Sequence, residues 1–426
     1  IVEFETATGQ RILINARREA TSIFVDQKLT LNYDREGRLY SAWIDGRNYR
    51  RSLDNRVLEK QEGPRPGLSY RVRRELGPYE ARQFLADAYA RVGAYRTALN
   101  DPATRVVSQS PDDAQIARDA LARVLACDLA QLERDRAIFN IIYKPINILP
   151  PDQYLALVLQ ATEGCSHNQC AFCGFYRDRK FHVKSADEFK KHIRDVRAFF
   201  GGGICLRKMI FLADANALII PQAQLLPLFD AINTEFAIHP IHCEGDALKD
   251  WESARPIHFE GIYSFIDAFT THRKTARDFT ELAARGLKRV YVGLETGDAE
   301  LLRFLGKPNA PEDVIRLVGD VKAGGVAVAV IVLVGAGGEK YAAQHVRHTV
   351  NLINALPLDQ NDLIYFSELV DYPHSEYSAL AHEANIRPLT IGEIEHQMTL
   401  MRAGFRFANF DRAPKVSYYD IREFIY

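Results

Sequence analysis

The sequence predicts an α/β protein in which a partial (β/α)6 barrel of the TIM type follows a β-meander and a helical segment. Between about residues 155 and 369, short apolar runs alternate with amphipathic helical stretches, which is typical of a parallel sheet with right-handed crossovers. The first 60 or so residues instead alternate apolar and polar positions in brief bursts, and residues 79 to 143 have a helical period. At 426 residues the chain exceeds one usual domain, so we expect four regions: a β-rich region at 1–75, a helical segment at 76–148, the barrel at 149–375 and an extension covering the barrel at 376–426.

Turn-forming pairs such as Thr8-Gly9 and Asp45-Gly46 separate the N-terminal bursts, so we predict an antiparallel meander there. The helical segment places Leu85, Val92 and similar residues on apolar faces. We hypothesise that the first 150 residues and the aromatic segment 418–426 cover the barrel mouth and shape a substrate pocket.

The barrel region begins after the pair Pro150-Pro151. Ser185 and Glu188 form a capping box at the start of one helix, and Gly286 stands where another should end. Strands are predicted at about 155–161, 208–214, 262–268, 289–294, 326–334 and 363–369, and helices at about 186–200, 221–234, 274–286, 311–324 and 340–356.

The composition is that of an ordinary globular protein, with 47% hydrophobic and 26% charged residues. The net charge of −1 gives no field that favours nucleic acid, so we expect no nucleic-acid partner. The longest apolar run, at 326–334, is far shorter than the roughly 20 residues that span a bilayer. No signal peptide is recognised, so we expect a cytoplasmic protein without a membrane span.

Six cysteines are too few for a disulfide scaffold, but Cys165, Cys170 and Cys173 stand close together directly after the first predicted barrel strand. Loops that leave the carboxyl ends of barrel strands carry the chemistry of such folds. Three thiolates in one loop can hold a four-iron cubane and leave one iron open to a small molecule. The alternatives are a zinc site with His167 as the fourth ligand, or plain buried cysteines.

This loop resembles the cluster-binding loop of radical S-adenosylmethionine (SAM) enzymes, which usually reads C-x3-C-x-aromatic-C. Phe172 occupies the aromatic position, and the first spacing is one residue longer, as in some branches of that superfamily. The resemblance implies that Cys165, Cys170 and Cys173 are the catalytic metal ligands of a [4Fe–4S] cluster. It also implies SAM as a second cofactor, with Phe172 beside it.

Two further segments carry the resemblance. Asp214 and Asn216 lie where the family has a Gly-Gly-Glu-like motif, which implies that they bind the amino group of SAM; the alternative is that Asp214 caps a helix. Glu295 lies in a segment that resembles Gly-Leu-Glu-Ser-Gly, which implies contact with SAM; the alternative is a buried ion pair with Arg273 or Lys307.

Val334 and Gly335 end the fifth predicted strand, where the family packs against the adenine, and the glycines that follow allow close approach of a ligand. Further polar residues are candidates for substrate binding at the barrel mouth. These are Asp267, His272, Arg273, Tyr365, Ser367 and Glu368, with Arg177 as a candidate contact to the cluster or SAM.

The resemblance implies reductive cleavage of SAM to a 5′-deoxyadenosyl radical that abstracts hydrogen from a substrate, in an oxidoreductase or transferase reaction. The electron would come from a reduced flavodoxin- or ferredoxin-like protein. We favour a small-molecule substrate; the alternatives are a peptide or protein substrate, recognised by the N-terminal β-region, and a structural or hydrolytic zinc-binding α/β protein. The remaining cysteines are scattered, so we expect no second cluster.

Overall fold

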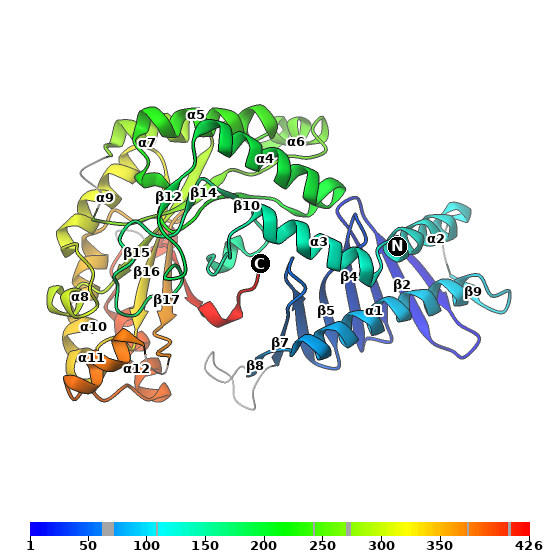
Figure 1. The fold of residues 1–426 in the computed structure, drawn as a ribbon, viewed down its shortest axis with the longest axis horizontal. Helices are drawn as coiled ribbons and strands as arrows, with labels where there is room; N and C mark the ends of the chain where they lie inside the picture. Colours follow the sequence, from blue (N-terminus) through cyan, green and yellow to red (C-terminus); the bar gives the residue numbers. More distant parts are fainter. Residues whose placement is uncertain (62–71, 108–109, 242, 270–273, 373–374, 408–409) are drawn as a thin grey trace. The chain divides into compact units, whose positions relative to one another are not determined.

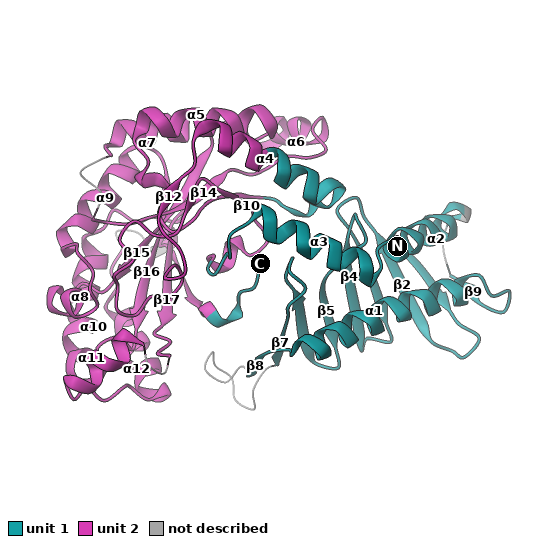
Figure 2. Cartoon of the chain, viewed as in Figure 1, with its two compact units in different colours: residues 1–148, 194–208, 422–426 teal, residues 149–193, 209–421 magenta. Residues whose placement is uncertain are grey.

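The computed structural model describes the chain except for residues 62–71, 108–109, 242, 270–273, 373–374 and 408–409. It divides into two compact units, each built from separate stretches of sequence (Figure 2). Unit 1 comprises residues 1–148, 194–208 and 422–426, and unit 2 comprises residues 149–193 and 209–421.

Unit 1 contains a nine-stranded sheet in the order β8-β7-β6-β5-β4-β3-β2-β1-β9 (Figure 1). Neighbouring strands β1 to β8 pair antiparallel in sequence order, which confirms the predicted meander. The strands are β1 Val2–Glu5, β2 Arg11–Ala16, β3 Ala20–Val25, β4 Leu29–Asp34, β5 Leu39–Ile44, β6 Arg47–Arg51, β7 Val57–Gln61, β8 Val72–Glu75 and β9 Arg105–Val106.

Helix α1 Pro78–Leu99 follows β8 and crosses the strands, and α2 Pro111–Ala126 and α3 Leu129–Ile142 follow β9 (Figure 1). Alternate strand residues such as Ile12 and Leu31 are fully buried and share one apolar cluster with Val92 of α1 and Leu121 of α2. The apolar residues on one face of the sheet and those on the apolar faces of the helices therefore form one core.

Unit 2 is built on a seven-stranded parallel sheet in the order β10-β13-β14-β15-β16-β17-β18. This arrangement confirms the predicted α/β class, and the helices lie outside the curved sheet (Figure 1). The strands are β10 Leu157–Gln160, β13 Ile210–Ala213, β14 Ile262–Ile266, β15 Leu287–Glu295, β16 Ala327–Val334, β17 Leu363–Glu368 and β18 Lys415–Tyr419. The helices are α4 Ala186–Phe200, which belongs to unit 1 from residue 194 on, α5 Gln222–Glu235, α6 Gly245–Ser253, α7 Ala276–Ala283, α8 Ala299–Phe304, α9 Pro311–Ala323, α10 Gly338–Ala355, α11 Glu376–Glu383 and α12 Ile391–Gly404.

The inner side of this sheet is filled by aromatic rings. Phe211, Phe265 and Tyr291 have ring centroids 5.1 to 5.9 Å apart. Asp152, before β10, accepts hydrogen bonds from the hydroxyls of Tyr291 (2.5 Å) and Tyr365 (2.8 Å). These rings and hydrogen bonds occupy the amino-terminal side of the sheet, whereas barrels of this type place their chemistry at the carboxyl edge.

The sheet has seven strands where six were predicted. The additional strand β18 lies in the segment that we expected to be a mixed, largely helical extension. Only five residues long, it mixes polar and aromatic residues at the edge of the sheet, so its periodicity is weak. The Tyr419 hydroxyl donates to the carbonyl of Leu149 (2.8 Å), and that of Tyr154 donates to the carbonyl of Asp420 (3.4 Å). These bonds tie the last strand to the segment that leads into the first.

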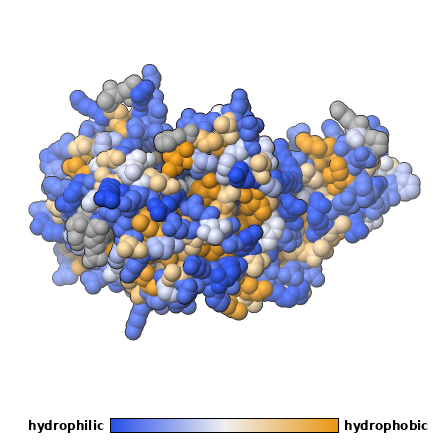
Figure 3. Space-filling model, turned by 90° about the horizontal axis from the view of Figure 1, so that it is seen from above, coloured by the Kyte–Doolittle hydropathy of each residue, from blue (hydrophilic) through white to orange (hydrophobic). Residues whose placement is uncertain are grey.

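The face drawn in Figure 3 is mostly hydrophilic, with hydrophobic residues exposed in separate patches. No helix among the described residues is both long enough and apolar enough to span a membrane.

Candidate functional site

The cysteine loop leaves the carboxyl end of β10 and is closed at its base by a short antiparallel pair, β11 Thr162–Glu163 and β12 His182–Val183. Lys184 Nζ donates to Glu163 Oε1 (2.7 Å) beside this pair. Gly164, at φ +81°, begins the loop, and a Cβ there would lie 3.2 Å from the carbonyl oxygen of Lys180. The left-handed backbone favours glycine here, and the tight approach adds to this preference.

Cys165, Cys170 and Cys173 are free, half-buried thiols within this one loop. The pKa of Cys170 is raised to about 12, mainly by burial; Lys307 opposes this shift, whereas Cys173 and Cys165 add to it. Burial also raises the pKa of Cys173, again with a contribution from Cys165. A metal that binds these thiols must displace their protons.

Hydrogen bonds inside the loop fix its conformation. The amide of Asn168 donates to Cys165 Sγ (3.3 Å), and Asn168 Nδ2 donates to the carbonyl of Tyr176 (3.0 Å). Arg177 donates to the carbonyls of Cys173 (3.3 Å) and Cys170 (3.1 Å), so its guanidinium holds the loop backbone.

Contacts from α8 and α11 hold the outside of the loop. His167 Nε2 donates to the carbonyl of Gly306 (2.9 Å), and the amide of Ala171 donates to the carbonyl of Leu305 (3.0 Å). Phe172 packs against an apolar cluster that includes Leu301 and Leu305. The predicted aromatic residue is thus anchored on the barrel wall.

Asp214, after β13, is almost fully buried and bonded to the base of the cysteine loop. Its Oδ1 accepts from Gln160 Nε2 (2.9 Å), and its Oδ2 accepts from the amide of Gly164 (3.0 Å) and lies 3.6 Å from Arg179 Nη1. Burial raises the pKa of Asp214 to about 6, although these hydrogen bonds and Arg179 act in the opposite direction. The carboxylate that we expected to bind SAM therefore also positions the loop.

Two buried oxygen atoms near these residues make no hydrogen bond within the described part of the chain, Ser166 Oγ and Asn216 Oδ1. Asn216 is 2% exposed, and its Nδ2 donates to the carboxylate of Asp267 after β14. Buried polar atoms without a partner are costly, so these two are available to a ligand.

Glu295 ends β15 at a φ of +58°, next to a bulge at Gly293. Its Oε1 lies 3.1 Å from Lys307 Nζ, which also donates to the carbonyl of Gly293 (2.9 Å). The sequence suggests an ion pair with Lys307 as an alternative to contact between Glu295 and SAM, and this ion pair is present. Burial alone would lower the pKa of Lys307, but Glu295 together with Cys170 and Asp267 raises it. Lys307 thus links the thiol loop electrostatically to the ends of β14 and β15.

Val334 is buried, and Gly335 follows it at φ +81°. The amide of Gly335 donates to Gln397 Oε1 of α12 (2.9 Å), and that of Gly337 donates to the hydroxyl of Tyr377 (2.9 Å). The glycine segment is therefore covered by side chains from residues beyond 375.

The other polar candidates have different positions. Tyr365 is bonded to Asp152 on the amino-terminal side, so the expectation that it lies at the barrel mouth is wrong. The reason is that its side chain lies near the start of β17, whereas Glu368, at the end, accepts from Tyr418 (2.8 Å). His272 and Arg273 fall outside the described residues.

Sequence reasoning missed Gln160 and Arg179, which both bind Asp214. A glutamine in the fully buried strand Leu-Val-Leu-Gln was an available clue, because a buried amide needs a partner. Arg179 offered no such clue.

A parallel α/β sheet with a thiol-rich loop at the carboxyl end of its first strand defines the class of barrel proteins that bind a cofactor at that edge. Residues 159–353 match the family model described as the Radical SAM superfamily. The chain therefore contains a radical SAM domain at these residues. The superfamily uses a [4Fe–4S] cluster and SAM, and its reaction requires an electron donor.

Several solved structures are similar to parts of the chain, whereas no curated protein matches it. The cobalamin-dependent SAM radical enzyme OxsB is 14% identical with a TM-score of 0.36, covering 59% of this chain and 31% of OxsB. The radical SAM methyltransferase TsrM from Kitasatospora setae is 18% identical with a TM-score of 0.38, covering 55% of this chain and 38% of TsrM. Coproporphyrinogen III oxidase (HemN) from Escherichia coli is 15% identical with a TM-score of 0.38, covering 66% of this chain and 58% of HemN. The chain thus spans about a third of the length of the first two.

Proposed function

We propose that Cys165, Cys170 and Cys173 hold the [4Fe–4S] cluster of this enzyme and that the chain uses it to cleave SAM and remove a hydrogen atom from a small-molecule substrate. The observation that carries the proposal is the set of three free thiols in one loop at the carboxyl end of β10. Three thiol ligands suit a cubane with one iron left for a small molecule.

The surrounding residues fit SAM as the second cofactor. Ser166 Oγ and Asn216 Oδ1 are buried acceptors without a partner in the described part of the chain, and an ammonium group would satisfy them. When bound, the cluster supplies the electron that breaks the C–S bond of SAM and gives the 5′-deoxyadenosyl radical. Asp214 and Arg177 keep the thiol loop in shape, and Phe172 excludes water on its side of the loop.

Glu295 has a different task in this proposal. Its carboxylate is paired with Lys307 Nζ, and a Cβ at Gly293 would lie within 3.1 Å of both charged groups, so a larger residue there would displace the pair. We assign Glu295 to the polar part of SAM, with Val334 and Gly335 near its adenine.

The test is anaerobic reconstitution with iron and sulfide, followed by reduction, addition of SAM and assay for 5′-deoxyadenosine. The expected result is four irons per chain and product formation, both lost in Cys165→Ala, Cys170→Ala and Cys173→Ala. Cys205→Ala and Cys243→Ala are the matched controls outside the loop and should retain both. A reconstituted chain that leaves SAM intact with an efficient reductant would overturn the proposal.

A peptide or protein substrate is the second candidate, with the antiparallel sheet of unit 1 as the recognition surface. To distinguish the two substrate classes, small metabolites and cell-derived peptide fractions are added separately to the reconstituted enzyme. The class that accelerates SAM cleavage contains the substrate. The electron donor proposed is a reduced flavodoxin- or ferredoxin-like protein, and the proposed compartment is the cytoplasm, where such donors operate on reduced thiols.

A further inference from the structure

The chain makes an excursion between α5 and β14 that includes α6. Its two ends meet in a parallel bridge between Ile238 and Phe259. The amide of His239 donates to the carbonyl of Phe259 (2.9 Å), and the amide of Phe259 donates to the carbonyl of Ala237 (2.9 Å). Because this bridge precedes β14, it lies at the amino-terminal edge of the sheet, whereas the cysteine loop leaves the carboxyl edge.

Three side chains of this excursion converge: His239 and His258 from the bridged ends and Glu252 from α6. One ligand atom of each lies within 4.8 Å of the other two. Glu252 Oε1 is 3.0 Å from His239 Nε2 and 3.7 Å from His258 Nε2. Ligands of a tetrahedral zinc ion are about 3.3 Å apart, since Zn–N bonds are about 2.0 Å.

The hydrogen bond of His258 determines which of its nitrogen atoms can bind a metal. His258 Nδ1 lies 2.7 Å from the carbonyl of Arg255, which only accepts hydrogen bonds, so Nδ1 carries a proton. In the neutral ring, Nε2 then presents a lone pair toward the Glu252 carboxylate. Metal-binding histidines commonly donate their other nitrogen to a backbone carbonyl in this way.

His239 provides a second, independent observation. Its side chain is 10% exposed, and its buried Nε2 makes no hydrogen bond in the part of the chain that the structure describes, despite its distance from Glu252. A buried ring nitrogen aimed at a carboxylate, without an aligned hydrogen bond, is satisfied by a cation between them.

We propose that His239, Glu252 and His258 form a second metal site that binds a divalent transition metal of the zinc class. Two imidazoles and one carboxylate suit zinc, cobalt or nickel, whereas a site for magnesium or calcium would be built from oxygen atoms. Nearby cations are engaged elsewhere: Lys288 Nζ donates to the carbonyl of Glu260 (3.1 Å), and the Arg255 guanidinium lies over the Trp251 ring (4.6 Å).

The metal joins both ends of the excursion to α6, so its role is to fasten this segment to the barrel. Three protein ligands leave a fourth position for water. The site uses none of the residues assigned to the cluster or SAM, so it stands whether or not SAM is cleaved.

The test is titration with Co²⁺ of the chain carrying Cys165→Ala, Cys170→Ala and Cys173→Ala, after treatment with a chelator. We expect one equivalent to bind, with visible d–d absorption and no thiolate charge-transfer band. If the triple variant is unstable, the same titration is made on the wild-type chain after a reconstituted cluster has occupied the three thiols. Zn²⁺ should displace the bound Co²⁺.

Variants identify the ligands. His239→Ala and His258→Ala should each weaken binding by at least about 100-fold, the upper end of losses seen for outer-shell partners. Glu252→Gln, which keeps the side-chain shape, should also weaken it, whereas the exposed His396→Ala is the control and should not. Absence of the bound equivalent, or binding unaffected by His239→Ala and His258→Ala, would overturn the proposal.

Trp251 supplies a second readout, because its ring centroid lies 5.5 Å from that of His239 and 5.9 Å from that of His258. The chain has only two tryptophans, so Trp43→Phe leaves Trp251 as the single reporter. Co²⁺ should quench its fluorescence with the same midpoint as the absorption change. Fluorescence that stays constant through the titration would contradict binding at this place.

Discussion

Glu295 Oε1 lies 3.1 Å from Lys307 Nζ, and both side chains are at least nine-tenths buried. The pair joins the strained end of β15 to the segment that follows α8. Since the partners neutralise each other in a largely dry environment, neither tolerates the loss of the other.

We therefore predict that Lys307→Met lowers the free energy of unfolding by about 3–5 kcal/mol, because it leaves a buried carboxylate uncompensated. The double variant Glu295→Gln/Lys307→Met should be clearly more stable than the sum of the single changes implies. Denaturant unfolding of the four proteins measures the coupling. Lys249→Met, which breaks an exposed pair with Asp246, is the control and should leave the midpoint nearly unchanged. Additive effects of the two changes would show that the pair is not coupled.

Asp214→Asn tests how the cysteine loop is positioned. The amide would present an N–H group to one of two donors, Gln160 Nε2 or the amide of Gly164. We expect iron affinity to fall about 10- to 100-fold, as for other outer-shell partners of a metal site. Iron content after gel filtration measures this, with Asp246→Asn, an exposed aspartate of α6 outside the loop, as control. Normal iron content with a raised KM for SAM would instead assign Asp214 to SAM alone.

Gly306→Ala tests the wall against which the loop rests. Gly306 has a φ of +70°, and an added Cβ would lie 2.9 Å from the carbonyl oxygen of Gln169 in the loop. We predict lower iron incorporation, because the backbone of one segment or the other must move. Gly319→Ala in α9 meets nothing within 4 Å and should stabilise the protein by about 0.5–1 kcal/mol. Equal iron content in the two variants would contradict the prediction.

His345 makes the stability of the barrel depend on pH. It is fully buried, accepts at Nδ1 from Thr296 Oγ1 (2.7 Å) and donates from Nε2 to the carbonyl of Leu333 (3.1 Å). Burial lowers its pKa from 6.5 to about 4, so between these values the unfolded chain binds the extra proton. The resulting stability is fully present above pH 6.5 and is lost as the pH falls toward 4, by on the order of 3 kcal/mol.

The measurement is the difference in unfolding free energy between wild type and His345→Gln at several pH values. This difference should shrink on acidification, whereas the exposed His396→Gln should show no such trend. The raised pKa of Asp214 makes the folded state more stable as the pH falls through the same range. This contribution is the same in both proteins, so it cancels in the difference. A difference that is constant with pH would contradict the role of His345.

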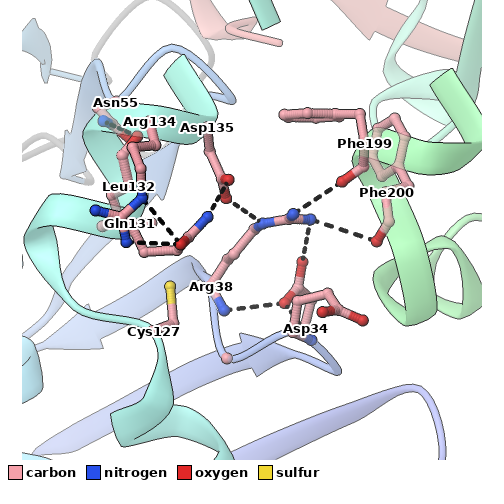
Figure 4. A network of polar contacts seen from close by, with 12 residues as sticks. Asp34, Arg38, Asn55, Cys127, Gln131, Leu132, Arg134, Asp135, Phe199 and Phe200 are labelled. Atoms are coloured by element: carbon pink, nitrogen blue, oxygen red, sulfur yellow. Dashed lines mark hydrogen bonds and ion pairs between the residues drawn. The ribbon is translucent and has the colours of Figure 1, made fainter. Parts of the chain in front are cut away.

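The buried guanidinium of Arg38 should contribute strongly to the stability of unit 1. Its Nε donates to Asp135 Oδ2 (2.6 Å), and its Nη2 and Nη1 donate to the carbonyls of Phe199 (2.8 Å) and Phe200 (3.4 Å), while Asp34 lies 3.7 Å away (Figure 4). The guanidinium thus satisfies carbonyls at the end of α4, which have no partner within the helix. Arg38→Met should cost about 3–5 kcal/mol, since it strands buried carboxylates. Arg38→Lys should recover little, because an ammonium lacks the planar fork.

Denaturant unfolding measures both variants, and Arg277→Met, in an exposed pair with Glu281, is the control. An Arg38→Lys variant as stable as the wild type would show that the forked geometry of the guanidinium does not contribute to the free energy of unfolding.

The sequence predicts the sheet class, the order of barrel elements and the cysteine loop, because periodicity and spacing are local properties. The capping box is an example: Ser185 N donates to Glu188 Oε2 (2.7 Å) and Glu188 N to Ser185 Oγ (3.3 Å). Lys307 was one of two partners considered for Glu295. The partners of Asp214 could not be assigned from the sequence, because they depend on packing between segments far apart in it. β18 was missed because an edge strand of five residues carries too little periodic pattern.

Unit 1 draws on residues 1–148, 194–208 and 422–426. During synthesis, Arg38 emerges from the ribosome more than 150 residues before the carbonyls that it holds, as the separations of 161 and 162 residues show. Glu423 reaches Lys60 (3.1 Å) and Arg73 (3.1 Å) only after every strand of the barrel has been made. Unit 1 therefore cannot reach its final form until the barrel strands have been synthesised, and a nascent chain carries an unfinished first unit throughout the time that the barrel takes to appear.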